Sequence, residues 1–182
     1  MGLLLCFDTY LRHGELRSLR VADVAFPGDP RLLVSEGAAA VFLRQTKAGR
    51  QQWVKVRDPL VVSLLRAMTL GVPGSAFLLG NERLELLSRF AESQLSLGLS
   101  AAVFVIHSVR HGGAAHDFLS GRSPFAEIKV RGRWSSHGIT TTYLQESQAR
   151  VLAVNMPKLV LDRVREYTSS NAYLWSVFGL VS

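Results

Sequence analysis

Residues 107–116 read HSVRHGGAAH and place three histidines and an arginine within ten positions, with two glycines directly after the second histidine. A cluster of this kind is typical of a metal site, of a phosphate site, or of an ordinary helix surface. His107 and His111 are four residues apart, so they share one face if the stretch is helical. The rest of the chain has to decide between the three interpretations.

A metal site is the less favoured interpretation of this stretch. The zinc-protease pattern requires a glutamate directly after the first histidine, and Ser108 stands there instead, with no nearby carboxylate or cysteine to complete a ligand set. Phosphate binding fits better, because His107 and Arg110 converge from the start of a helix, where free N–H groups and the helix dipole attract anions. Gly112 and Gly113 would let another backbone segment pack closely behind them.

The composition favours a globular chain that binds nucleic acid. Its 182 residues suffice for one domain with a core, and a hydrophobic content of 48% excludes a disordered chain. The formal charge is +7, and 17 of the 21 basic residues are arginine, whose planar fork of donors fits phosphate oxygens. The alternative is a basic surface that binds nothing.

Cys6 is the single cysteine, which excludes a disulfide within the chain and a cysteine-based zinc site. We expect it to be a buried thiol of the core. The N-terminus lacks the basic stretch of a signal peptide and its apolar run is too short to span a membrane, so we expect a soluble, intracellular protein. The abrupt start MGLLLCF resembles a helix cut partway, and we expect the chain to be a piece of a longer one.

The hydrophobic pattern predicts a mainly α-helical domain with a small antiparallel β-sheet near its start, an α+β fold. Expected strands are 32–35, 38–45 and 51–56, with a turn at 46–50. Asp58 is a predicted N-cap, with Pro59 at the first helical position. Helices are expected at 2–10, 13–24, 58–68, 82–98, 110–120, 124–132 and 137–147, with one or two more in 148–178.

Three further motifs accompany the histidine cluster. Arg12 follows an apolar helix and Glu15 comes three residues later, an arrangement that holds an arginine rigidly or forms only a surface salt bridge. Lys47 lies at a hairpin tip, where a lysine is usually just solvated. Trp134 stands nine residues before Tyr143, which lies on a short polar helix where a core aromatic residue is less expected.

Together these motifs resemble the tyrosine recombinase (phage integrase) family. Residues 9–24, TYLRHGELRSLRVADV, are similar to the family's first arginine box, with Tyr10 where the family usually has glycine. Residues 107–134 are similar to the second box, from H-x-x-R to G-(H/W), with Arg133 where a glycine is common. Trp134 in place of the second histidine is most similar to the Cre-like members. The resemblance covers residues 3–150, and its ordered set of residues is specific although no single one is.

The resemblance implies the catalytic-domain fold of that family and the cleavage and rejoining of double-stranded DNA through a 3′-phosphotyrosyl intermediate. Arg12 and Arg110 would bind the nonbridging oxygens of the scissile phosphate while Tyr143 attacks it. Lys47 would protonate the leaving 5′-hydroxyl group. The implied catalytic residues are Arg12, Lys47, His107, Arg110, Trp134 and Tyr143. Glu15 would pair with one of the arginines without contacting the phosphate itself.

The covalent link conserves bond energy, so the resemblance implies neither a nucleotide cofactor nor a metal. His111 is then expected to support the fold, and His116 to be structural or exposed. The implied partners are duplex DNA and further copies of the chain, as a tetramer on paired sites, with no membrane and no small-molecule substrate. DNA integration by a mobile element and a location with DNA, in the nucleus or the nucleoid, belong to the same expectation.

The expected organisation is a catalytic domain over 1–150, without the family's N-terminal core-binding domain, and a C-terminal helical tail over 151–182. The apolar end of this tail needs a cover. It either folds back on its own domain or, as the resemblance implies, passes to the next protomer, with residues 168–171 as a polar hinge.

Three other functions stay open. A type IB topoisomerase uses the same phosphotyrosyl chemistry but relaxes supercoiled DNA. A catalytically inactive remnant of a recombinase would still bind DNA but would not cut it. A helix-turn-helix regulator fits the charge and the helices, but it leaves the ordered arginine, lysine and tyrosine residues unexplained.

Overall fold

The computed structural model describes residues 1–32, 38–46, 51–99 and 104–134, together with the single positions 158, 159, 162 and 166. The chain divides into two compact units, Met1–Leu87 with Val105–Leu144 and Ser88–Phe104 with Gln145–Ser182. The helix predicted at 137–147 lies outside the described residues, as does the tail apart from the four single positions. The domain boundary predicted at residue 150 therefore stays a prediction.

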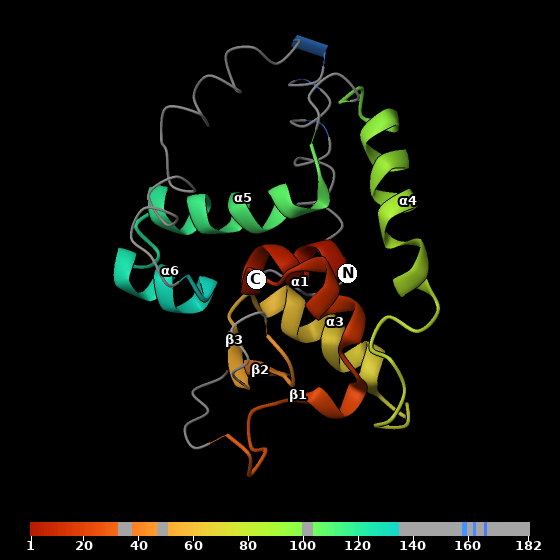
Figure 1. Ribbon diagram of the computed structural model, residues 1–182, viewed down its shortest axis with the longest axis vertical. Helices are drawn as coiled ribbons and strands as arrows, with labels where there is room; N and C mark the ends of the chain where they lie inside the picture. The colour runs from red at the N-terminus through yellow and green to blue at the C-terminus, as the bar shows by residue number, and fades with distance from the viewer. Residues whose placement is uncertain are drawn as a thin grey trace. The chain divides into compact units, whose positions relative to one another are not determined.

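The first unit is mainly α-helical and contains a three-stranded antiparallel sheet, which confirms the fold class predicted from the sequence (Figure 1). The predicted helices 58–68, 82–98 and 124–132 are present within two residues of their expected ends. The elements are α1 (Gly2–Thr9), α2 (His13–Ser18), the 3-10 turn η1 (Val21–Asp23), β1 (Val24–Ala25), β2 (Ala39–Leu43), β3 (Gln52–Val56), α3 (Pro59–Thr69), α4 (Glu82–Ser96), α5 (Ile106–Leu119) and α6 (Phe125–Gly132).

The sheet is built on the pair β2 and β3, in which Val41 lies opposite Val54. All five positions of β2 are apolar and all but Phe42 are buried, so both faces of this central strand are largely covered. β2 is the central strand, and β1 pairs with its other edge through Val24 and Ala25. The sequence predicted this strand at 32–35 instead. Leu32 is not in a strand, and residues 33–35 lie outside the described part.

The helix predicted over 13–24 is wrong beyond Ser18. Leu19 has extended backbone and ends α2, and its carbonyl accepts a hydrogen bond from the segment that precedes α4. A carboxylate oxygen of Asp23 then accepts from the backbone N–H of Arg20 at 2.9 Å and caps the turn η1. The apolar residues of 13–24 have helical spacing because they are buried in the same core. The chain nevertheless leaves the helix, because the Asp23 carboxylate caps the turn that leads into the sheet.

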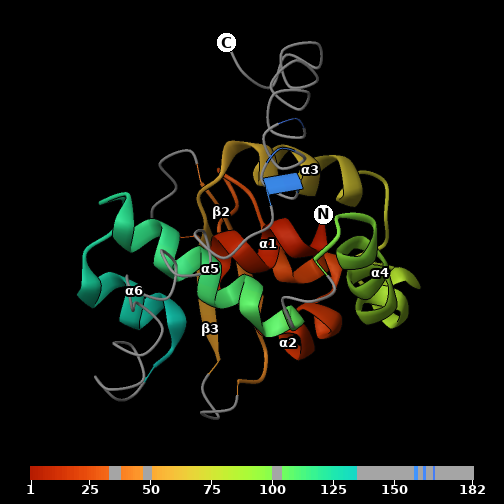
Figure 2. The ribbon, with the colours of Figure 1, turned by 90° about the horizontal axis from the view of Figure 1, so that it is seen from above.

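α1 lies between α5 on one side and β3 with α3 on the other (Figures 1 and 2). The contact with α5 is close at Gly113, where an added Cβ would lie 2.0 Å from the carbonyl oxygen of Phe7. At Gly112 the nearest atom is in the Phe7 ring, at an ordinary 3.5 Å. The sequence predicted that these glycines admit a neighbouring backbone, and the structure confirms this at Gly113.

The main core lies between α1, the sheet and α3. Cys6 belongs to it, is 1% exposed, and has a pKa raised to about 12 chiefly by burial, so its thiol is neutral and the predicted buried role is confirmed. A second, smaller cluster joins α1, α5 and α6 through Tyr10, Ala114, Ile128 and Trp134. This second cluster places the end of α6 beside the end of α1.

Replacing Asp58 with alanine is expected to lower the free energy of unfolding by about 1 kcal/mol. Its carboxylate caps α3 by accepting from the backbone N–H groups of Leu60, at 2.9 Å, and Val61, at 3.4 Å, and Pro59 opens the helix as predicted. Urea denaturation measures the loss. Asp58→Asn is the matched control, because asparagine also caps helices and should retain most of the stability. Equal losses in both variants would contradict the capping role.

Candidate active site

Arg12 and Glu15 form one rigid unit at the start of α2. Arg12 is the residue before the helix; its backbone N–H donates to Oε2 of Glu15 at 2.8 Å and its Nη1 donates to Oε1 at 3.0 Å. The Arg12 side chain is 30% exposed, whereas that of Glu15 is 7% exposed. The ion pair expected from the sequence is therefore present, and it holds a partly exposed guanidinium in one orientation.

His107, Arg110 and His111 all lie on α5, which begins at Ile106, four residues earlier than predicted. His107 is therefore in the first turn of the helix, as the phosphate-site hypothesis requires. The rings of His107 and His111 meet edge to face, with their centroids 4.6 Å apart. Arg110 points into the protein and is only 1% exposed.

The backbone carbonyl of Tyr10 connects the two arginine motifs. It accepts from Nη1 of Arg110 at 2.6 Å and from Nη2 of Arg133 at 2.9 Å. Tyr10 adopts the left-handed conformation with φ 53°, which turns this carbonyl toward α5 and explains in physical terms why glycine suits the position. Its hydroxyl donates to Oδ2 of Asp117 at 2.5 Å, which anchors the buried side chain.

Trp134 closes the second cluster and is 7% exposed. Its ring stacks on that of Tyr10, with 6.2 Å between centroids, and the guanidinium carbon of Arg110 lies 5.1 Å from the centroid of the indole ring. A Cβ at Gly132 would lie 2.3 Å from the indole, so only glycine fits there. The carbonyl of Gly132 also accepts from Nη2 of Arg110, so this guanidinium bridges the end of α1 and the end of α6.

Arg133 is the site residue that sequence reasoning missed. Its Nη2 donates to Oε2 of Glu15 at 2.7 Å as well as to the Tyr10 carbonyl, and its side chain is 4% exposed. It also has the left-handed conformation, with φ 56°. The sequence signal was the departure from a common glycine, which indicates a backbone position with positive φ. It did not reveal the partner of the side chain.

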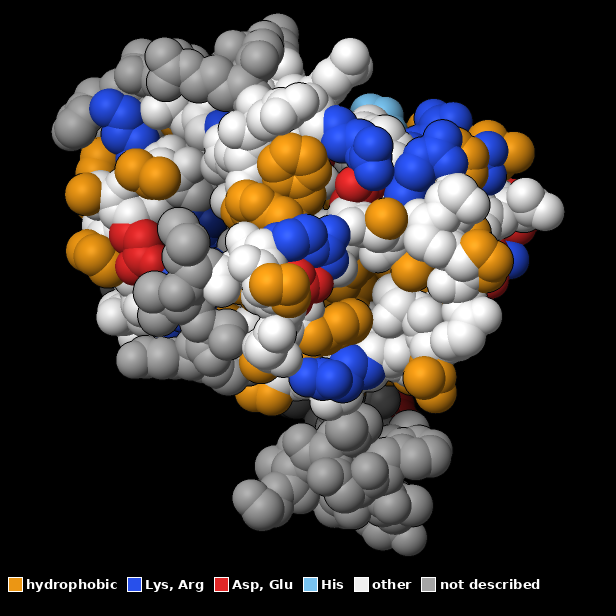
Figure 3. Space-filling model, turned by 90° about the horizontal axis from the view of Figure 1, so that it is seen from below, with side chains coloured by type: hydrophobic (Ala, Val, Ile, Leu, Met, Phe, Trp, Pro, Cys, Tyr) orange, Lys and Arg blue, Asp and Glu red, His pale blue; other side chains and the backbone are white. Residues whose placement is uncertain are grey.

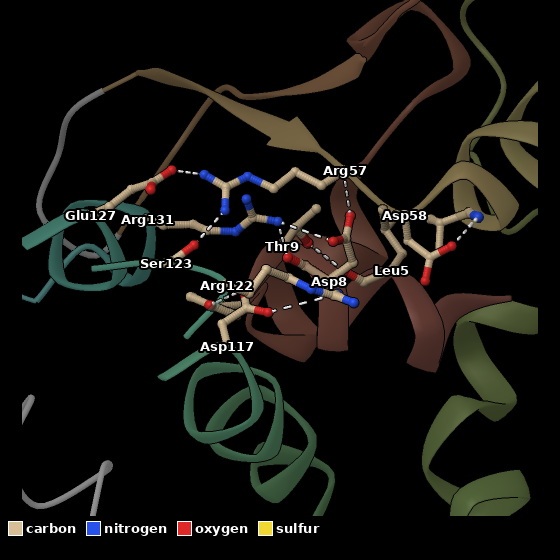
Figure 4. A network of polar contacts seen from close by, with 12 residues as sticks. Leu5, Asp8, Thr9, Arg57, Asp58, Asp117, Arg122, Ser123, Glu127 and Arg131 are labelled. Atoms are coloured by element: carbon tan, nitrogen blue, oxygen red, sulfur yellow. Dashed lines mark hydrogen bonds and ion pairs between the residues drawn. The ribbon is translucent and has the colours of Figure 1, made fainter. Parts of the chain in front are cut away.

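A second polar network fixes α6 against α1 and the end of β3 (Figure 4). Asp8 accepts from the backbone N–H of Arg57 at 2.8 Å and pairs with Nη2 of Arg131, and Arg57 also pairs with Glu127. Arg131 and Asp8 are 5% and 8% exposed, so burial raises the pKa of Asp8 while Arg131 opposes the shift. Because α6 carries Gly132 at its end, this network determines where the site's backbone lies.

The site is electrostatically positive around its histidines. Burial lowers the pKa of His107, and the nearby Arg110 and Arg12 lower it further. Burial, then His107 and then Arg110 lower the pKa of His111 to about 4. Both imidazoles are therefore neutral at pH 7, and a neutral ring in a cationic site donates one N–H without adding charge.

The free energy of unfolding is expected to fall as the pH is lowered from about 6.5 toward 4, because the unfolded chain protonates a histidine near pH 6.5. Native His111 has a pKa of about 4 and stays neutral in this window, so the unfolded state binds more protons. His107 contributes in the same direction. Urea denaturation at pH 7 and pH 5 measures the effect.

His111→Leu is the comparison for this prediction, since it removes the titrating group at a partly buried position. Its stability should decline less between pH 7 and pH 5 than that of the native chain. Comparing the two proteins cancels the contribution of carboxylates such as Asp8, whose pKa burial raises. An identical decline in both would show that His111 is not the group responsible.

Basic side chains gather on one face of the molecule, where Figure 3 shows a group of Lys and Arg beside a histidine. On α2 and directly before it, Arg12, His13 and Arg17 are each partly exposed. A basic surface of this kind attracts polyanions with a strength that falls as salt rises. Among the described residues, no three His, Cys, Asp or Glu side chains cluster closely enough to hold a metal ion. No helix in the described part of the chain is long and apolar enough to cross a membrane.

Of the residues expected from the sequence, Arg12, Glu15, Arg110 and Trp134 are connected by the contacts given above. His107 lies in the first turn of α5, three residues before Arg110. The other two, Lys47 and Tyr143, lie outside the described residues. His116 is exposed and its ring lies 5.6 Å from that of Phe7, which agrees with the structural or exposed position expected for it.

The fold is similar to that of the XerH site-specific recombinase, solved in a pre-cleavage complex with its difH substrate. The TM-score is 0.60 at 14% sequence identity, and the match covers 86% of this chain and 46% of the recombinase. No family model matches the sequence. No curated protein matches it either. The likeness shows that the fold resembles that of a recombinase, as predicted from the sequence, and the chain spans less than half the length of that recombinase.

Proposed function

We propose that this chain cleaves and rejoins double-stranded DNA as a tyrosine recombinase, through a covalent link between a 3′-phosphate and Tyr143. The observation that carries the proposal is the convergence of Arg12, His107 and Arg110 around the end of α1, although they come from motifs far apart in the chain. The fold likeness supports it, since the similar protein is a site-specific recombinase bound to DNA.

In this proposal the phosphate is bound first by Arg12, the most exposed guanidinium of the group. Tyr143 attacks the phosphorus and loses its phenol proton to solvent, the bond to the 5′-oxygen breaks, and Lys47 gives that oxygen its proton. A phenol is a weak nucleophile near neutral pH, so the arginines must stabilise the charge that builds up on the phosphate. Rejoining reverses these steps with a 5′-hydroxyl group as the attacking group.

Arg110 takes part from inside the protein. Both of its terminal nitrogens donate to main-chain carbonyls, of Tyr10 and Gly132. Because its side chain is only 1% exposed, a phosphate reaches it only after the residues over it move. We expect DNA binding to cause this movement.

Trapping of the covalent intermediate tests the proposal. The 182-residue chain is incubated with a library of randomised duplexes carrying a nick, and stopped with denaturant so that phosphotyrosyl protein migrates with the DNA. Tyr143→Phe should abolish the adduct and retain DNA binding, whereas the matched control Tyr167→Phe should leave it unchanged. Adduct formation by Tyr143→Phe, or none by the native chain on any duplex, would overturn the proposal.

A DNA-binding protein that does not cut is the second candidate, favoured by the burial of Arg110. It predicts affinity for duplex DNA without any adduct. Both candidates share a steep salt dependence, with the logarithm of the affinity falling by about 0.9 per phosphate contact for each tenfold rise in salt. Plasmid relaxation without specific sites would instead indicate the topoisomerase alternative.

Assembly as a tetramer on paired sites, with the tail over 151–182 exchanged between protomers, belongs to the same proposal, as does a location with DNA in the cell. Deleting residues 169–182 tests the exchange. The shortened chain should stay folded and bind single sites while losing cooperative assembly on paired sites. Unfolding of the shortened chain would show that the segment is part of its own domain's core.

A further inference from the structure

Arg133 stands at a backbone position that most side chains avoid. Its φ of 56° lies in the left-handed region, which glycine enters freely and other residues enter at a cost. A long charged side chain persists at such a position only if its contacts offset that cost. The contacts of Arg133 therefore indicate what it does.

The guanidinium of Arg133 faces the protein and not the solvent. With 4% of its side chain exposed, it donates from Nη2 to Glu15 and to the Tyr10 carbonyl, and from Nη1 to the carbonyl of Arg131 at 3.1 Å. It therefore does not reach a DNA strand itself. Any effect on a bound phosphate passes through a neighbour.

That neighbour is Glu15, whose two carboxylate oxygens are divided between two arginines. Oε1 accepts from Nη1 of Arg12, while Oε2 accepts from the backbone N–H of Arg12 and from Nη2 of Arg133. Two guanidiniums thus face one buried negative charge. If Arg133 were missing, that charge would act on Arg12 alone, and it would weaken the attraction of Arg12 for a phosphate in a site where water screens little.

We propose that Arg133 is a positioning residue that balances the charge of Glu15, so that the positive charge of Arg12 stays available to the scissile phosphate. The inference rests on the proposed function for the identity of the phosphate. It goes beyond that function by assigning a role to a buried arginine that touches neither the DNA nor the reacting atoms.

Arg133→Gly tests this role, because glycine relieves the backbone conformation and removes the charge. The rate of adduct formation should fall by about 10- to 100-fold, by analogy with residues that orient the ligands of a metal ion. Adding Glu15→Gln to this variant should recover part of the loss, since no unbalanced carboxylate then remains. A double variant no faster than Arg133→Gly, or a single variant as fast as the native chain, would overturn the proposal.

A merely structural arginine would lower the fraction of folded protein and leave the rate per folded molecule unchanged, so urea denaturation is measured beside the rate. A loss of rate that disappears when it is expressed per folded molecule would overturn the proposal. Arg133→Asn is carried alongside, with and without Glu15→Gln, since asparagine also tolerates the left-handed conformation. This second pair keeps the test decisive if the glycine variant does not fold. Arg66→Ala is the matched control for net charge, because Arg66 is exposed on α3 and packs only over the ring of Phe26 among the contacts given for it.

Adduct formation by the native chain tests the proposed function separately from the role of Arg133. If that chain forms no adduct, strand cleavage is wrong, and the Arg133 proposal is decided by the dissociation constant for duplex DNA at fixed salt. Arg133→Gly should then bind more weakly than the native chain and than Arg66→Ala, and Glu15→Gln should restore part of the affinity. No restoration would overturn the role of Arg133 whatever the function.

Discussion

Replacing Gly113 with alanine is expected to unfold the first unit or to destabilise it by at least about 3 kcal/mol, beyond the usual range for adding one methyl group to a core. The added Cβ would lie 2.0 Å from the carbonyl oxygen of Phe7 and 2.8 Å from its carbonyl carbon. These are backbone atoms of α1, which cannot rotate away as a side chain can. The helices α1 and α5 would have to separate, and α1 packs against the sheet on its other side.

Gly112→Ala is the matched control, one residue earlier on the same helix. There the Cβ would meet only the Phe7 ring at 3.5 Å, an ordinary contact. Alanine is also the better helix former by about 1 kcal/mol, so this variant should be as stable as the native chain or more stable. Urea or thermal denaturation measures both. Similar stabilities for the two variants would mean that α1 and α5 do not approach as closely as described.

Replacing Arg110 with alanine is expected to abolish strand cleavage and also to lower the free energy of unfolding by about 2–5 kcal/mol, because one buried carbonyl loses its donor and another keeps only its bond from Arg133. Those carbonyls belong to Tyr10 and Gly132, at the ends of α1 and α6. The guanidinium also packs on the indole of Trp134, and that contact is lost with it. Arg110→Lys should not restore function, because an ammonium group is not a planar fork.

The combination of the two losses is the informative result for Arg110. A residue that only binds phosphate would lose cleavage and keep native stability, since a charge held in readiness for DNA contributes little to folding. The control is Arg122→Ala, whose side chain is 54% exposed and 3.9 Å from Asp117, and which should change stability by less than about 0.5 kcal/mol. If Arg110→Ala had the same free energy of unfolding as the native chain, the hydrogen bonds of Arg110 to the two carbonyls would not stabilise the fold.

Much of the fold could be predicted from the sequence, because its signals are local. Asp58 and Pro59 mark the start of α3 by the chemistry of a helix cap. The failure over residues 13–24 has an equally local cause: apolar spacing does not distinguish a helix from a chain that turns into the core three residues later. The deciding contact was the capping of Arg20 by Asp23, which spacing does not encode.

The sequence predicted which residues belong to the candidate site, but it did not predict how their side chains are arranged or how deeply they are buried. The pairing of Arg12 with Glu15 follows from their spacing, and it is present. The burial of Arg110 could not be predicted, because it depends on the Tyr10 carbonyl, which a left-handed backbone turns toward α5. The departures from glycine at Tyr10 and Arg133 indicate positive φ, but they do not reveal which group the turned backbone or the side chain contacts, so the contact between Arg133 and Glu15 was missed as well.

The backbone and the ring of Tyr10 make opposite contributions to stability. A glycine there would adopt the left-handed conformation freely, whereas tyrosine adopts it at a cost of about 1–2 kcal/mol. Yet the ring is 0% exposed and stacked on Trp134, so a glycine would leave a cavity that costs about 3–5 kcal/mol. The position is therefore locked: the strained backbone conformation is retained because the second cluster packs around the ring, and relieving the strain would cost more stability than it restores.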